Sequence, residues 1–173
     1  MTDLSHSCFL NSDLGRFVGE RLNGDQSDVV HDLLAHLAEQ MIEMNKQKQV
    51  ETGSFLKWLE RQIGAKIDDL DNKTKLRAYF DHDFETLLDV LRQNSGKLEN
   101  KITRAMEENI EREFKRSMSK LAPLTDKIAA TDRLIDLIVY RLYGLTEEEV
   151  AIVEGTATDQ PTRGENRHEP DGN

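Results

Sequence analysis

The sequence predicts an all-α protein, a helical bundle with one long helical hairpin and a disordered C-terminal tail. Through most of the chain, apolar residues recur at steps of three and four, the period of an amphipathic helix, and strand-like alternation is nearly absent. The 173 residues include only three prolines, at positions 123, 161 and 170, which favours long helices. Apolar residues make up 37% and charged residues 32%, a balance typical of helices with wide solvent-facing sides.

The N-terminal segment is expected to be loose at residues 1–11 and helical after that. Ser12 or Asp13 can cap the start of a short helix, since both side chains accept backbone hydrogen bonds well. The Asn23–Gly24 pair then predicts a stop and a turn.

A long amphipathic segment follows, with Ser27 as its predicted N-cap. Its apolar stripe fades after residue 44 and resumes between residues 55 and 63. Gly53 therefore either kinks one long helix or separates two, and Gly64 fits the C-terminal cap position. The first part of the stripe is formed by Val29, Val30, Leu33, Leu34, Leu37, Met41 and Met44.

The second half of the chain predicts two short helices and then two strong ones. Short helices are expected at Lys75–Phe80 and Phe84–Leu91. A strong stripe runs over Ile102–Leu121, where Pro123 is expected to stop or bend the helix because proline lacks a backbone donor. A second strong stripe covers Leu124–Leu142.

Thr146 and Glu149 match a capping box that opens a short last helix, and Gly144 is the expected C-cap before it. The helical domain is thus expected to cover residues 12–155. Residues 156–173 contain Ala157 as their one apolar residue and are expected to form a disordered tail.

A heptad pattern in the long helix holds for two repeats and then fails at Lys48 and Glu51. This favours a bundle with a protruding hairpin over a long coiled-coil zipper. The aromatic residues Trp58, Tyr140 and Tyr143 lie on helical stripes, so packing is favoured over stacking on bases. The side chains expected to pack in the core or against a partner are Leu34, Leu37, Met41, Trp58, Ile135, Ile138, Tyr140, Leu142 and Tyr143.

The formal net charge of −10 makes the whole chain a poor stand-alone DNA binder, because cations that neutralise phosphates dominate DNA affinity. Cys8 is the single cysteine, so no internal disulfide can form. The sequence carries no recognisable signal peptide and no apolar run near the length of a membrane span. A cytoplasmic protein without a membrane partner is expected.

No motif predicts catalysis, a bound cofactor or a metal site, so we expect none of the three. His31 and His36 lie five residues apart, which does not place both on one helix face. The run Asp81–Asp83 is better explained as acidic capping of a helix start than as a metal site. The sequence also lacks a glycine-rich phosphate loop and the Asn-Pro-Pro-aromatic tetrapeptide of amino-methylating DNA enzymes.

One basic region stands out, and its cations are expected to share one helix over residues 97–121. Its seven cations face five interspersed glutamates, so two interpretations stay open. The cations belong either to a mixed-charge solvated helix or to a face that contacts DNA phosphates. They are Lys97, Lys101, Arg104, Arg112, Lys115, Arg116 and Lys120.

The segment Ala130–Glu154, ATDRLIDLIVYRLYGLTEEEVAIVE, resembles the C-terminal end of type IIG restriction–modification enzymes and related adenine-specific DNA methyltransferases. The segments Asp28–Lys48 and Asp83–Leu91 resemble helices of the same region, so the likeness covers roughly residues 27–155. In that family the N-terminal part cuts or methylates DNA with S-adenosylmethionine. Helices near the C-terminus brace the target-recognition domain and help clamp the duplex.

The resemblance implies a non-catalytic helical accessory or scaffold module of a DNA restriction–modification system, since this chain carries none of the family's catalytic motifs. Its expected partners are a methyltransferase or specificity polypeptide and, directly or through that polypeptide, double-stranded DNA. Two alternatives remain. The chain could be part of a split adenine-specific methyltransferase, which bound S-adenosylmethionine would favour. It could also be a helical protein-interaction module unrelated to DNA, which the lack of a salt-sensitive effect on DNA would favour.

Overall fold

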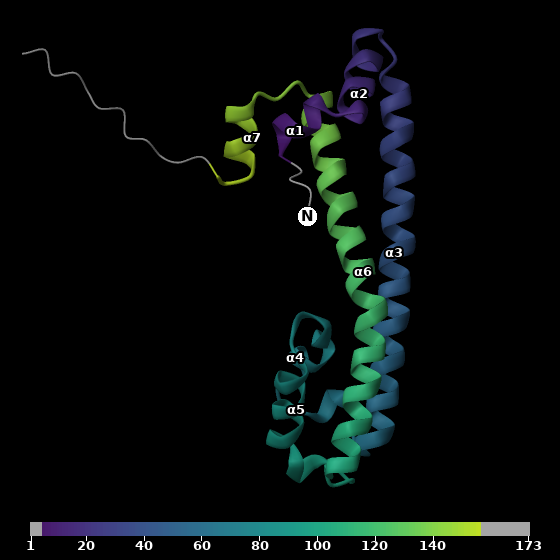
Figure 1. The fold of residues 1–173 in the computed structure, drawn as a ribbon, viewed down its shortest axis with the longest axis vertical. Helices are drawn as coiled ribbons and strands as arrows, with labels where there is room; N and C mark the ends of the chain where they lie inside the picture. The colour runs from purple at the N-terminus through teal and green to yellow at the C-terminus, as the bar shows by residue number, and fades with distance from the viewer. Residues whose placement is uncertain (1–4, 157–173) are drawn as a thin grey trace, which may run out of the picture.

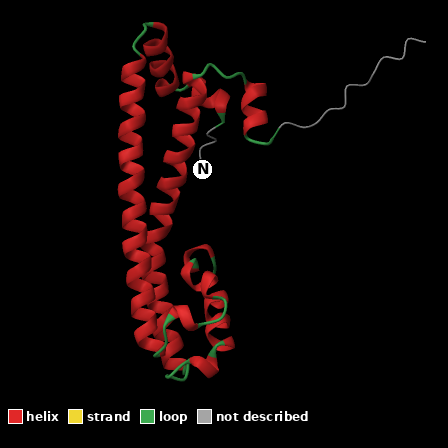
Figure 2. Cartoon of the chain, turned by 180° about the vertical axis from the view of Figure 1, so that it is seen from behind, coloured by secondary structure: helices red, strands yellow, loops and turns green. Residues whose placement is uncertain are grey.

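The protein is described by a computed structural model that covers residues 5–156, and it forms an elongated, all-helical rod (Figures 1 and 2). Two long antiparallel helices, α3 (Ser27–Ile63) and α6 (Arg104–Leu142), pack side by side and form a hairpin. No residue in the described range lies in a strand. The predicted all-α hairpin is therefore confirmed, while the predicted tail beyond Thr156 lies outside the described residues.

Short helices gather at the two ends of the hairpin (Figure 1). At one end, the chain segments before α3 and after α6 pack together. At the other end, the chain that connects α3 to α6 folds back on both helices. The elements of the first end are α1 (His6–Asn11), α2 (Asp13–Asn23) and α7 (Glu147–Val153). Those of the second are η1 (Ile67–Asp69), α4 (Lys73–Arg77), η2 (Tyr79–Asp81), α5 (Phe84–Gln93) and η3 (Ser95–Lys97).

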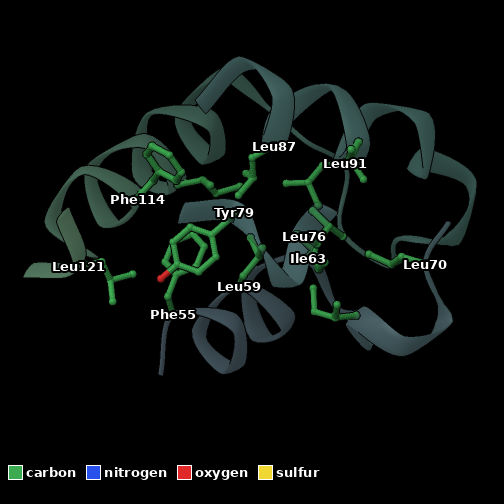
Figure 3. Close-up of a cluster of buried hydrophobic side chains, with 13 residues drawn as sticks. Phe55, Leu59, Ile63, Leu70, Leu76, Tyr79, Leu87, Leu91, Phe114 and Leu121 are labelled. Atoms are coloured by element: carbon green, nitrogen blue, oxygen red, sulfur yellow. The ribbon is translucent and has the colours of Figure 1, made fainter. Parts of the chain in front are cut away.

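The connecting segment and the adjoining halves of α3 and α6 enclose one hydrophobic core, here called the insertion core (Figure 3). Its aromatic centre is the Phe55 ring, whose centroid lies 4.3 Å from that of Tyr79. The buried Asn94 amide ties the loop to α5, because it accepts the Asp71 N–H and donates to the Val90 carbonyl. The buried members are Phe55, Leu59, Ile63, Ile67, Leu70, Leu76, Tyr79, Leu87, Val90, Leu91, Ile110, Phe114 and Leu121.

A second, smaller core, here called the terminal core, forms at the other end. Its buried members come from α1, α2, α7 and the ends of α3 and α6 that meet them. An Arg133–Glu154 ion pair adds a polar tie between α6 and the residue that follows α7. The buried members are Phe9, Val18, Val30, Leu137, Ile138, Tyr140 and Val150.

Between the two cores, α3 and α6 have only each other to pack against, and we call this stretch the waist. Met41 and Met44 of α3 and Leu124 and Ile128 of α6 are half-buried there. The polar run that weakens the heptad pattern after residue 44 belongs to this stretch. The waist therefore buries much less apolar surface per residue than either end does.

Several predicted helix ends are confirmed. Gly64 adopts the left-handed conformation (φ 68°) after α3, and its N–H donates to the Glu60 carbonyl. Thr146 and Glu149 form the predicted capping box of α7. Asp83 caps α5, since its carboxylate accepts the Thr86 N–H at 2.8 Å. This hydrogen bonding to Thr86 lowers the pKa of the Asp83 carboxyl below its ordinary value.

The prediction of a loose segment at residues 1–11 is wrong for residues 6–11, which form α1. Ser5 caps this helix and Phe9 is buried in the terminal core. The six residues of α1 are too few to display a helical period in the sequence. Its stability comes from Phe9 packing against segments that are distant in sequence.

Two expected breaks in long helices are absent. Gly53 lies inside the uninterrupted α3, so the first of the alternatives, one helix, is correct. Pro123 lies inside α6, so the first of its two alternatives, an end of the helix at that residue, is wrong. Pro123 is exposed, and the helix on both sides of it is anchored by a core, which outweighs the loss of one backbone bond.

Candidate nucleic-acid interface

Charge is unevenly distributed along the rod. Residues 46–120 form the half with the insertion core and carry 16 Lys and Arg against 14 Asp and Glu. The other described residues, 5–45 and 121–156, carry 5 Lys and Arg against 14 Asp and Glu. We call these two halves the basic end and the acidic end. The strongly negative net charge of the chain therefore does not apply to the basic end.

The predicted phosphate-contacting cations all lie at the basic end, but not all on one helix. Thr103 caps α6, its hydroxyl accepting the Met106 N–H, so the helix begins only at Arg104. Lys97 lies in η3 and Lys101 in the loop before the cap. The prediction that these two lysines share the helix is therefore wrong. The remaining cations are exposed on α6 and are Arg104, Arg112, Lys115, Arg116 and Lys120.

Most of these cations have a carboxylate close by. Three pairs lie within α6, where Arg104, Lys115 and Arg116 meet Glu108, Glu111 and Glu113 at 3.1, 2.6 and 3.7 Å. Two link different segments, with Lys97–Asp71 and Lys120–Glu51 both at 2.8 Å. Within the described chain, Arg112 and Lys101 form no ion pair. The outer face of α6 is thus largely the mixed-charge solvated surface that the sequence left as one alternative.

A large hollow of about 930 Å³ lies on the surface where α3 ends. Its cations come from three separate segments: Lys57 and Arg61 from α3, Lys66 from the loop that follows, and Lys97 from η3. Lys57 and Arg61 form no ion pair within the described chain. Sequence reasoning missed these α3 cations, since neither forms part of a basic run and the turn that brings Lys97 beside them was not predicted.

Two smaller hollows continue from this one along the contact between α3 and α6. The first, of about 240 Å³, shares Ser54 with the large hollow and is lined by Trp58, Arg116 and Lys120. The second, of about 310 Å³, shares Glu51 and Lys120 with the first and extends to Lys127. We call the three together the basic groove. Its cations are Lys57, Arg61, Lys66, Lys97, Arg116, Lys120 and Lys127.

Carboxylates also line the basic groove, and two of them are engaged in holding the fold. Glu60 accepts the Ile67 N–H at 3.0 Å and lies 3.7 Å from Lys66. Glu51 pairs with Lys120 at the junction of the two smaller hollows. Beneath this junction, burial raises the pKa of Tyr79 to about 12, and the negative charge of Glu51 adds to the effect. The groove is therefore basic but contains internal counter-charges.

The residues predicted to pack in the core or against a partner fall into three groups. Ile138 and Tyr140 are buried in the terminal core. Tyr143 is 75% exposed, so it is not a core residue, because α6 ends just before it and α7 does not cover it. The others are half-buried: Leu34, Leu37, Met41, Trp58, Ile135 and Leu142. Trp58 packs against the insertion core, and Leu34, Leu37 and Leu142 pack against the terminal core.

Other surface features complete the description. Ile152 and Val153 of α7 are exposed at the acidic end, as Tyr143 is. Cys8 is exposed on α1. Among residues 5–156, no three or more His, Cys, Asp or Glu side chains are grouped so that they could hold a metal ion. In the same range, no helix combines the length and the apolar character needed to cross a bilayer.

Comparison with known proteins identifies one family. A family model described as a domain of unknown function (DUF8810) matches residues 27–139. The matched region begins with the first residue of α3 and ends near the C-terminus of α6, so it contains the hairpin, the insertion core and the basic groove. No curated protein and no solved structure matched the chain.

Proposed function

We propose that this chain, which belongs to the DUF8810 family of domains of unknown function, is a non-catalytic helical module of a DNA restriction–modification system. In this role it braces a methyltransferase or specificity polypeptide and contacts DNA phosphates. Recognition of the target sequence and methyl transfer are assigned to that partner polypeptide.

The observation that carries the proposal is the separation of charge along the rod. The basic end concentrates 16 of the 23 Lys and Arg residues of the chain. Phosphate contacts supply most of the non-specific affinity for DNA, so this end is the part of the molecule suited to the duplex. The acidic end would be repelled by DNA and suits a protein surface instead.

The acidic end also offers apolar contacts to a protein. Tyr143, Ile152 and Val153 are each more than 60% exposed there. Exposed aromatic and aliphatic side chains framed by charge are the composition of a protein interface. A polypeptide with a basic surface around an apolar pocket would match this end.

The hairpin fixes the distance between the two ends. α3 has 37 residues, which corresponds to a length of about 55 Å at 1.5 Å per residue. With a packed core at each end, the rod can hold DNA and a protein partner at a set separation. That is the mechanical task of a brace and requires no reacting group on this chain.

The test is co-purification of the tagged full chain from its native host, with the bound proteins identified by mass spectrometry. The proposal expects a methyltransferase or specificity polypeptide in stoichiometric amount, and a complex whose DNA affinity falls steeply with added salt. Recovery of the chain alone, together with no salt-sensitive DNA binding, would remove the proposal.

A further inference from the structure

We propose that the basic groove, rather than the outer face of α6, is where the protein holds the DNA backbone. This inference rests on the proposed function, since it names the surface that the duplex would contact. The ligand is the phosphodiester backbone of a duplex, which the cations of the groove would bind without reading the base sequence.

The first argument is convergence. The four cations that line the large hollow come from segments separated by up to 40 residues, and the insertion core fixes these segments around one concavity. Asn100 strengthens this arrangement, because its backbone N–H and its side-chain amide donate to the carbonyls of Ile63 and Gln62. The loop that carries Lys97 is thereby fastened to the end of α3. Cations held in place before binding lose less conformational entropy when a phosphate arrives.

The second argument is availability. On the outer face of α6, Arg104 and Lys115 each meet a glutamate four residues away on the same helix. A phosphate would have to displace that local partner. Lys57 and Arg61 are exposed, lie one helical turn apart, and form no ion pair within the described residues. They are the cations most ready to bind an external anion.

The third argument is length. The groove follows α3 from Gln47 to Gly64, a rise of about 25 Å along the helix axis. Duplex DNA rises 3.4 Å per base pair along its axis, so the groove spans the axial length of roughly seven base pairs. Lys127 and Lys97 lie in the two outer hollows, and the cations between them line the same path.

Glu51 acts as a competitor inside this path. Its carboxylate pairs with Lys120 at 2.8 Å, at the junction of the two smaller hollows. A phosphate that contacts Lys120 there must compete with Glu51. Removing the Glu51 charge should therefore strengthen DNA binding, a gain that an effect on the outer face of α6 would not produce.

The experiment measures binding of the full chain to a fluorescent 20-base-pair duplex by anisotropy over a series of salt concentrations. The variant Lys57→Gln with Arg61→Gln should lower the affinity and reduce the slope of log affinity against log salt by about two, one for each lost phosphate contact. The matched control, Lys73→Gln with Lys75→Gln, removes two cations from α4 at the same end but outside the groove, and should leave the slope unchanged. Glu51→Gln should raise the affinity.

Failure of this inference can be told apart from failure of the proposed function. If the wild-type chain and its complex show no salt-dependent binding, the proposed function fails. If wild type binds but Lys57→Gln with Arg61→Gln behaves like the control, only the groove is overturned. A reduced slope in Arg112→Gln with Lys115→Gln instead would place the duplex on the outer face of α6. Circular dichroism of each variant checks that the helices are intact.

Discussion

The hydroxyl groups of Tyr79 and Ser117 lie 2.6 Å apart inside the insertion core, and both residues are almost completely excluded from solvent. This hydrogen bond joins η2, in the connecting segment, to α6 across a chain separation of 38 residues. A buried hydroxyl without a partner is costly, so the pair specifies how the connecting segment docks on the hairpin.

Breaking this pair should destabilise the protein. Tyr79→Phe or Ser117→Ala alone leaves one buried hydroxyl unpaired, and each should lower the free energy of unfolding by about 1–3 kcal/mol. The double variant should lose less than the sum of the two, since no unpaired hydroxyl remains. Denaturant unfolding of the four proteins measures the coupling. Strictly additive losses would mean that the two hydroxyls do not interact.

Tyr79 should also make stability depend on alkaline pH. Burial raises the pKa of Tyr79 to about 12 in the folded protein, from an ordinary value of 10.0. Between pH 10 and 12 the unfolded chain therefore loses this proton while the folded protein keeps it. This group should lower the free energy of unfolding by about 1.4 kcal/mol per pH unit in that window. The measurement is the difference between wild type and Tyr79→Phe in urea unfolding at several pH values.

The control for this titration is Tyr143→Phe, at a tyrosine that is 75% exposed. The Tyr143→Phe protein should lose stability between pH 10 and 12 to the same extent as wild type. A Tyr79→Phe protein that lost stability between pH 10 and 12 just as wild type does would show that burial of this phenol does not govern its ionisation.

One pair of variants separates the core from the candidate interface. Ile138 is fully buried, so Ile138→Asp should strongly destabilise the fold by placing an unpaired charge in the terminal core. Lys115→Glu with Arg116→Glu changes two exposed cations and should leave the fold intact while weakening DNA binding. Circular dichroism and anisotropy report the two effects. The reverse order of damage would contradict this assignment of faces.

Pro123→Ala should stabilise the protein. Proline in a helix interior is unfavourable relative to alanine by up to about 3 kcal/mol, and position 123 is exposed, so the change removes no core contact. Alanine also restores a backbone donor for the Ser119 carbonyl. Thermal unfolding should show a higher midpoint, with Ala122→Gly as a variant of opposite expected sign. An unchanged or lower midpoint would show that Pro123 is needed for the packing of α6.

The long helices could be predicted because their apolar residues repeat with the helical period over many residues. The stripe from Val29 to Ile63 and the caps at Gly64 and Thr146 are local signals, and the structure has each of them. α1 was missed because a six-residue helix has no readable period, and Phe9 finds its partners far away in sequence. The predicted helix end at Pro123 was wrong because packing in the cores at both ends of α6 outweighs the local tendency of proline to end a helix.

The candidate interface was harder to predict for a similar reason. The α6 cations are visible as a run, but their glutamate partners neutralise much of that run. Lys57 and Arg61 acquire their neighbours Lys66 and Lys97 only after the chain turns at Gly64 and returns through η3. Composition and spacing hold no signal of such convergence, since it is created by tertiary packing.

The two cores differ in how the chain must close to form them. The insertion core draws all its buried members from one continuous stretch, Phe55 to Leu121, whereas the terminal core joins Phe9, Val18 and Val30 to residues beyond position 136. Closing the second core therefore orders a loop of more than a hundred residues, and closing the first does not. The insertion core should condense first during folding and be the last to open, and amide hydrogens at the acidic end should exchange sooner than those around Tyr79.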